Sequence, residues 1–245
     1  MRLHSLQNLF LATLCLLATT PLIGQGASNG ANEEPIFKVR FRVLAWEASI
    51  TDLFYLQDGE QIPFLASHSI PSNWMEYRGP APLVFYRPSL PSVDANAPPP
   101  LPIPAASFYP RASGEWLFLI INNPDPDAPP PYKLGVIPDP QENRLEGVRV
   151  LNFSSSEVAV QINNEVMRIP PEGADHLRPA PRPDNSLTMR IAVREAASWE
   201  LFFSTVLEDR KNSRLTLFIE ESEGKINLRR FSESLTVPIP ARIPE

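Results

Sequence analysis

Proline is the residue that most limits what this chain can fold into. The 245 residues include 29 prolines, spread from Pro21 to Pro244. The proline ring fixes φ and removes a backbone donor, so it breaks helices and interrupts the middle of a sheet. The density argues against long helices and favours short strands joined by irregular loops.

Between the prolines, apolar residues alternate with polar ones or form short runs, as is typical of β-strands. We therefore predict an all-β fold. In the first half of the chain the predicted strands are Phe37–Trp46, Asp52–Leu56, Ala81–Tyr86, Glu115–Ile121 and Tyr132–Ile137. In the second half they are Val148–Phe153, Val158–Ile162, Leu187–Arg194, Trp199–Val206, Arg214–Ile219 and Ile226–Phe231.

One segment, Glu195–Asp209, fits two patterns. Its large apolar residues, Trp199, Phe202, Phe203 and Val206, recur at the spacing of a helix face. The run from Phe202 to Val206 is nevertheless rich in strand-forming residues. We predict a strand.

A phrase that occurs twice indicates an internal repeat. Arg42–Trp46 (RVLAW) matches Arg149–Phe153 (RVLNF), 107 residues later, and in each case a polar break and a second strand follow. We interpret the chain as two tandem, duplicated antiparallel β-sandwich domains.

Two later matches have a shorter spacing. Trp116 matches Trp199 at 83 residues, and Tyr132 matches Arg214 at 82. The difference requires an insertion in the first unit, and Pro88–Pro104 is the candidate. Its composition predicts an exposed, polyproline-like loop.

The first residues have the pattern of a secretory signal peptide. Arg2 precedes an apolar run at 9–18, and small residues follow at 24–27. The run is shorter than the roughly 20 residues of a membrane-spanning helix; an uncleaved anchor is the alternative. Cleavage near residue 26 removes Cys15, the single cysteine, so we expect an exported chain without disulfides.

These features predict a signal peptide at 1–26, a disordered leader at 27–35, and two β-units at 36–146 and 147–235. The proline-rich insertion at 88–104 belongs to the first unit, and a proline-rich tail occupies 236–245. With the phrase Val148–Ser154 (VRVLNFS), this organisation resembles uncharacterised secreted bacterial proteins built from paired immunoglobulin-like β-sandwich units. The resemblance implies export and the fold, and it supplies no catalytic residue.

The charge of the chain bears on its partners. After cleavage 21 basic and all 28 acidic residues remain, a formal charge of −7. An acidic chain with scattered basic residues argues against nucleic acid or an anionic membrane as a partner. We expect a protein or glycan partner in the cell envelope, in the periplasm or outside the cell, and no membrane span after cleavage.

The exported chain has no recognisable catalytic motif. It lacks cysteine, G-x-S-x-G and a phosphate-binding glycine loop, and its two histidines, His68 and His176, are far apart. Glu115, Glu200 and Glu221 are nominal candidates for a glycosidase pair, but each also fits the solvent side of a strand. We predict no enzyme activity and no cofactor.

The turn Asn122–Asp127 is the densest group of oxygen ligands. Calcium binds about six to eight oxygens, and such a turn supplies two or three of them. Asn, Asp and Pro are also the residues that a tight loop uses. We predict no metal site, and calcium binding here is the alternative.

Trp74 and Tyr77 are the candidate ligand-binding residues. They lie in the loop-like run Pro71–Pro80, and exposed aromatic side chains on a rigid scaffold suit binding. Alternatively, they close the edge of the sandwich. The remaining tryptophans lie in apolar strands and are expected in the core: Trp46, Trp116 and Trp199.

The leading hypothesis is an exported, non-catalytic β-sandwich protein with an envelope structural or interaction role. The alternative is a carbohydrate-binding or accessory module that uses the exposed loop of Trp74 and Tyr77. Export, the all-β pattern and the lack of catalytic motifs favour the first.

The strand that opens the second unit has two apolar faces. Val148 and Val150 point one way, and Leu151 and Phe153 point the other. Since the larger side chains occupy the Leu151 face in both copies of the repeat, we expect that face to form the main core. Val150 is then expected to be less buried.

The export signal gives the first testable prediction. The mature protein should begin between about residues 24 and 32, where small residues follow the apolar run. N-terminal sequencing of exported material checks this, and a chain that still begins at Met1 would contradict it.

Overall fold

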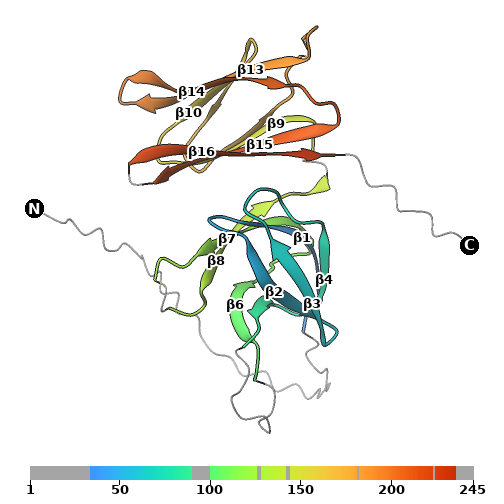
Figure 1. Ribbon diagram of the computed structural model, residues 1–245. Coiled ribbons are helices and arrows are strands. Elements are labelled where there is room, and N and C mark those ends of the chain that lie inside the picture. The colour runs from blue at the N-terminus through green and yellow to red at the C-terminus, as the bar shows by residue number, and fades with distance from the viewer. Residues whose placement is uncertain are drawn as a thin grey trace, which may run out of the picture. The chain divides into compact units, whose positions relative to one another are not determined.

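The computed structural model describes residues 34–89, 100–125, 128–141, 144–180, 182–222 and 224–235. Sixteen β-strands form its regular structure (Figure 1), which confirms the all-β fold. Among the described residues no helix has the length and apolarity needed to cross a bilayer. The predicted signal peptide, nearly all of the predicted leader and the segment 236–245 lie outside the described residues.

The first sandwich consists of two four-stranded sheets. Sheet A has the order β4 (Met75–Gly79), β1 (Phe37–Ala45), β7 (Gly114–Asn122) and β8 (Tyr132–Pro138). Sheet B has the order β3 (Glu60–Ala66), β2 (Ile50–Gln57), β5 (Leu83–Arg87) and β6 (Ile103–Phe108). Buried aromatic rings in edge-on and tilted contacts fill the space between them, among them Phe41, Tyr55, Phe85 and Phe118.

The second sandwich repeats this arrangement. Sheet C has the order β12 (Ala174–Leu177), β9 (Gly147–Phe153), β15 (Ser213–Ser222) and β16 (Lys225–Ser234). Sheet D has the order β11 (Glu165–Ile169), β10 (Val158–Ile162), β13 (Ser186–Glu195) and β14 (Ser198–Glu208). Its core is aliphatic, with Val150, Val160, Ile191 and Leu217 fully buried.

Adding eight to each strand number of the first sandwich gives the strand order of the second, so the duplication extends through the whole topology. The chain is therefore two tandem β-sandwich domains, as expected. The strands pair antiparallel except for β1 with β7 and β9 with β15, which are parallel. The antiparallel expectation was wrong for these two pairs.

The match of Arg42–Trp46 to Arg149–Phe153 joins equivalent strands, β1 and β9. The later matches were wrong by one strand. Trp116 lies on β7, whose counterpart is β15, whereas Trp199 lies on β14. Aromatic and aliphatic residues recur in every buried strand, so a short apolar phrase does not identify which strand it belongs to.

Five strands were not predicted: β3, β4, β6, β11 and β12. Two of them had a visible signal. The β2–β3 hairpin turns at Asp58-Gly59 and the β10–β11 hairpin at Asn163, all with positive φ, and such residues favour tight hairpin turns.

The predicted insertion lies between β5 and β6, where the second sandwich has only the connection Ala196-Ala197 between β13 and β14. Residues 90–99 of the insertion lie outside the described residues. The expectation of a loop up to Pro104 was wrong at its end, because Ile103 and Pro104 pair with Arg87 and Tyr86.

The ambiguous segment forms strand β14, as predicted. The register of β13 and β14 shifts so that Phe203 faces Ile191 and Leu201 faces Ala192, which leaves Phe202 as an extra residue. Because of this extra residue, the apolar side chains before and after the bulge no longer alternate in one continuous two-residue period. Their spacing in the sequence therefore resembles that of a helix.

The prediction about the faces of β9 was wrong. Val150 is fully buried between sheets C and D, whereas Leu151 belongs to a separate cluster. That cluster joins the two sandwiches and comprises Leu44, Leu117, Leu119, Ile137, Leu151, Phe218 and Phe231. Both faces of β1 and β9 are buried, and side-chain size does not tell a sandwich core from an interface between sandwiches.

Beside this cluster lies a buried ionic group centred on Asp139, which follows β8 and is fully buried. Its carboxylate accepts hydrogen bonds from Arg42 at 2.7 Å, Arg149 at 3.0 Å and Arg214 at 3.0 Å. Glu233 on β16 completes the group by pairing with Arg42 and Arg214. The group thus joins residues of both sandwiches.

The arginines set the protonation of Asp139. Burial by itself raises its pKa, but the hydrogen bond and charge of Arg214 and the charges of Arg42 and Arg149 outweigh burial and lower the pKa. A carboxyl whose pKa is lower in the folded state stabilises the fold above its unfolded pKa of about 3.9. That stabilisation is lost as the pH falls through the folded pKa.

Asp139→Asn should lower the free energy of unfolding at pH 7 by about 3–5 kcal/mol, because it leaves buried arginines without their counter-charge. It should also flatten the fall in stability between about pH 5 and pH 2. Urea unfolding across this range measures both effects. The control is Asp58→Asn in the exposed β2–β3 turn, and an equal loss in the two variants would contradict the assignment.

Candidate functional site

The predicted pair Trp74 and Tyr77 does not form an exposed loop. Tyr77 lies on β4 and is buried, with its hydroxyl donating to the carbonyl oxygen of Pro80 at 2.7 Å. Trp74 is half-buried, and three guanidinium groups surround its ring. Arg144 lies 3.9 Å from the ring centroid, and Arg40 and Arg42 each lie 4.8 Å from it. A ligand-binding role for the pair stays a prediction. Little of either ring is free to contact a ligand, because Tyr77 is buried and three arginines surround Trp74.

The three nominal carboxylates lie in three different sheets: Glu115 on β7, Glu200 on β14 and Glu221 on β15. Burial alone raises the pKa of Glu115, but bonds and charges from Arg40 and Arg144 outweigh it and lower the pKa. Glu221 accepts a hydrogen bond from the Ser155 hydroxyl at 2.5 Å.

The two histidines also lie apart. His68 has its ring nitrogens beside the hydroxyls of Ser49 and Ser69, at 3.0 and 3.1 Å. His176 lies on β12, and burial lowers its pKa. In the described part of the chain no three His, Cys, Asp or Glu side chains gather closely enough to hold a metal ion.

The turn after β7 is held by bonds within itself. The side-chain amide of Asn123 donates to the carbonyl oxygen of Pro130 at 3.1 Å, and the backbone amide of Asp125 donates to the Asn123 side chain at 3.3 Å. Residues 126 and 127 lie outside the described residues, so calcium binding at Asn122–Asp127 stays an untested alternative.

The most unusual surface of the described chain is the free edge of β14. This strand pairs with β13 on one side and, among the described residues, has no partner strand on the other. It is 11 residues long and contains no proline. Its counterpart in the first sandwich, β6, has six residues and includes Pro104, which lacks a donor.

The outward face of β14 carries three exposed apolar side chains. Trp199, Leu201 and Val206 are 39%, 60% and 66% exposed. They lie opposite the outward residues Arg194, Ala192 and Thr188 of β13, while Phe203 and Leu207 pack toward the core. Exposed apolar side chains in a row along an unpaired edge are typical of a binding surface.

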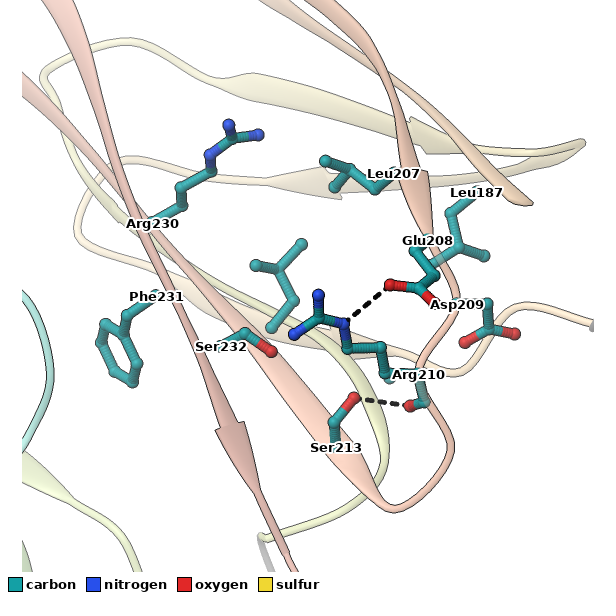
Figure 2. Close-up of a pocket in the computed structure, with 11 residues that line it drawn as sticks. Leu187, Leu207, Glu208, Asp209, Arg210, Ser213, Arg230, Phe231 and Ser232 are labelled. Atoms are coloured by element: carbon teal, nitrogen blue, oxygen red, sulfur yellow. Dashed lines mark hydrogen bonds and ion pairs between the residues drawn. The ribbon is translucent and has the colours of Figure 1, made fainter. Parts of the chain in front are cut away.

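An opening between sheets C and D lies at the C-terminal end of this strand. A cavity of ≈ 290 Å³ separates β14 from β16, with Leu187 and Leu207 on one side and Phe231 and Ser232 on β16 (Figure 2). In the first sandwich the equivalent strands, β6 and β8, contact each other directly. The second sandwich is therefore more open along this edge.

Polar residues line the mouth of the cavity. The guanidinium of Arg210 pairs with the carboxylate of Glu208 at 3.0 Å. The backbone carbonyl oxygen of Arg210 accepts a hydrogen bond from the Ser213 hydroxyl at 2.5 Å. Figure 2 shows Arg210 between the two sheets and Arg230 on β16. An extended segment laid along β14 would meet backbone donors and acceptors at its edge, apolar side chains on its face and charged groups at its end.

This edge was not among the sites predicted from the sequence, and the expectation that Trp199 lies in the core was wrong. One signal was available. No proline occurs between Pro183 and Pro238, the longest such interval in the chain. The strands β13 to β16 fall in that interval, so their edges lack the residue that elsewhere denies pairing.

Comparison with known protein families finds none whose model matches this chain. No curated protein matches it either.

The arginines around Trp74 give a prediction that separates packing from ligand binding. Trp74→Ala should lower the free energy of unfolding by about 2 kcal/mol, since it removes a half-buried ring and its cation–π contacts. Trp199→Ala is the matched control, because that ring is exposed and its nearest guanidinium, Arg168, lies 5.8 Å away. Urea unfolding compares the two, and a larger loss for Trp199→Ala would contradict this role of Trp74.

Proposed function

We propose that this chain is an exported, non-catalytic β-sandwich protein that acts in the cell envelope by binding an extended polypeptide segment along the free edge of β14. The observation that carries the proposal is the length of that edge, its lack of proline and its exposed apolar face. Export rests on the N-terminal sequence pattern.

Strand addition explains how such an edge binds. The unpaired N–H and C=O groups of an edge strand pair with an incoming backbone, and alternate side chains of the new strand contact the face of the sheet. Leu201 and Val206 lie on that face. Each apolar cross-strand pair that forms on that face contributes roughly 0.2–1 kcal/mol.

Two features of β14 limit uncontrolled pairing at its edge. Glu200 and Glu208 are exposed on β14, and the bulge at Phe202 interrupts its regularity. Charges and bulges are common means of limiting edge-to-edge association. The strand thus keeps an apolar middle while its charges disfavour indiscriminate pairing, which suits selective binding.

A non-catalytic role fits the separation of Glu115, Glu200 and Glu221 into different sheets. The alternative, a carbohydrate-binding or accessory module at Trp74 and Tyr77, has weaker support. Tyr77 is buried, and arginines surround the ring of Trp74.

A random-peptide display library, selected on the exported protein, tests the proposal. Bound peptides should be extended with alternating apolar residues, and they should slow amide hydrogen exchange at residues 198–208. Leu201→Lys and Val206→Lys should weaken binding at least about tenfold, because each places a charge in the apolar contact.

The matched control is Leu65→Lys, since Leu65 is 51% exposed on β3 of the first sandwich. It should leave binding unchanged. Selected peptides that protect other strands but not 198–208, or an equal loss in the control, would overturn the proposal.

A further inference from the structure

The ten residues that follow the described chain have a regular pattern. Segment 236–245 reads TVPIPARIPE, with prolines at 238, 240 and 244. All three positions are even. The odd positions hold the apolar residues Val237, Ile239, Ala241 and Ile243.

In an extended strand this parity has a physical meaning. Successive residues turn their N–H and C=O groups to opposite edges and their side chains to opposite faces. Prolines at even positions therefore remove donors from one edge alone, and the odd residues keep theirs on the other edge. The same odd residues place four apolar side chains on one face, so this sequence suits a strand that pairs on one side and ends a sheet.

The free edge of β14 matches these properties. In the part of the chain that the structure describes, this edge has one row of backbone groups without a partner strand, and Leu201 and Val206 are exposed on the outward face. Arg242 is the one basic residue of the segment and could pair with Glu200 or Glu208 of β14, while Glu245 makes the segment neutral as a whole. One added strand would place apolar cross-strand neighbours beside Leu201 and Val206 and leave its proline edge toward solvent.

The connection to β16 favours a second copy as the molecule that supplies the strand. The backbone amide of Leu235 donates to the carbonyl oxygen of Asn212 at 2.7 Å, so the chain continues the line of β16 up to that residue. A return to β14 of the same molecule would have to reverse the chain direction soon after Leu235 and pass from sheet C to sheet D. Leu235–Val237 contains none of the Gly, Asn or Asp residues that favour chain reversal.

We propose that segment 236–245 of one molecule adds as a strand to β14 of a second copy of the chain. The inference rests on the proposed function and names its partner as another copy. Each molecule then donates one strand and accepts one, so the contact is heterologous and links molecules into a ring or an open series.

Light scattering across a range of concentrations compares the full exported chain with a chain that ends at Leu235. Both keep all sixteen described strands. The full chain should self-associate, and the shortened chain should stay monomeric and unfold with the midpoint that the full chain shows at concentrations too low for association. Leu201→Lys in the full chain should also prevent association, whereas Leu65→Lys should not.

A synthetic peptide of residues 235–245 provides an independent measurement by fluorescence anisotropy. It should bind the shortened chain and dissociate the assembled full chain. The control peptide exchanges Pro240 with Ala241 alone, which keeps the composition and places prolines at both even and odd positions. It should bind at least about tenfold more weakly, because in either register at least one missing donor then faces the pairing edge.

A full chain that stays monomeric and exposes the β14 amides to exchange only after shortening would assign the segment to its own molecule and overturn the inference. Equal binding of the two peptides would overturn it too. If the 235–245 peptide fails to bind while library peptides still protect 198–208, this inference falls and the proposed function stands.

Discussion

The ionic group around Asp139 is the interaction on which the structure depends most. A fully buried carboxylate is costly unless its partners are complete, and removing one partner leaves a charge buried without compensation. Here the partners come from β1, β9 and β15, with Glu233 on β16 satisfying two of the arginines. The group is complete only when both sandwiches are folded and in contact.

The apolar cluster beside the ionic group also forms from residues of both sandwiches. Leu44 and Leu151 occupy equivalent positions of the repeat and meet in one cluster. An outward face that would be polar in an isolated sandwich has therefore become apolar in both copies. This explains why alternation predicted the strand β9 correctly but not its inner face. Val150 and Leu151 are both buried, and the information that separates their surroundings lies in residues far away in the chain.

Local patterns accordingly predicted the elements better than the site. Strand content and the repeat of Arg42–Trp46 depend on short stretches of sequence. The surroundings of Trp74 are not, since Arg40 and Arg144 approach it from distant segments. The edge of β14 could not be found by looking for ligand-type residues, because its distinguishing properties are a lack of proline and, within the described part of the chain, the lack of a paired neighbour.

The order in which the chain is made gives the Asp139 group a further consequence. Arg42, Leu44, Leu117 and Asp139 are all synthesised before Arg149, Phe218 and Glu233. A first sandwich that folds early would carry an uncovered apolar strip and a carboxylate that lacks two of its three arginines. The first sandwich thus reaches its final stability only after the last strands have been synthesised. A chain that terminated within those strands would expose an apolar surface and an incompletely paired carboxylate, and it would be prone to aggregate.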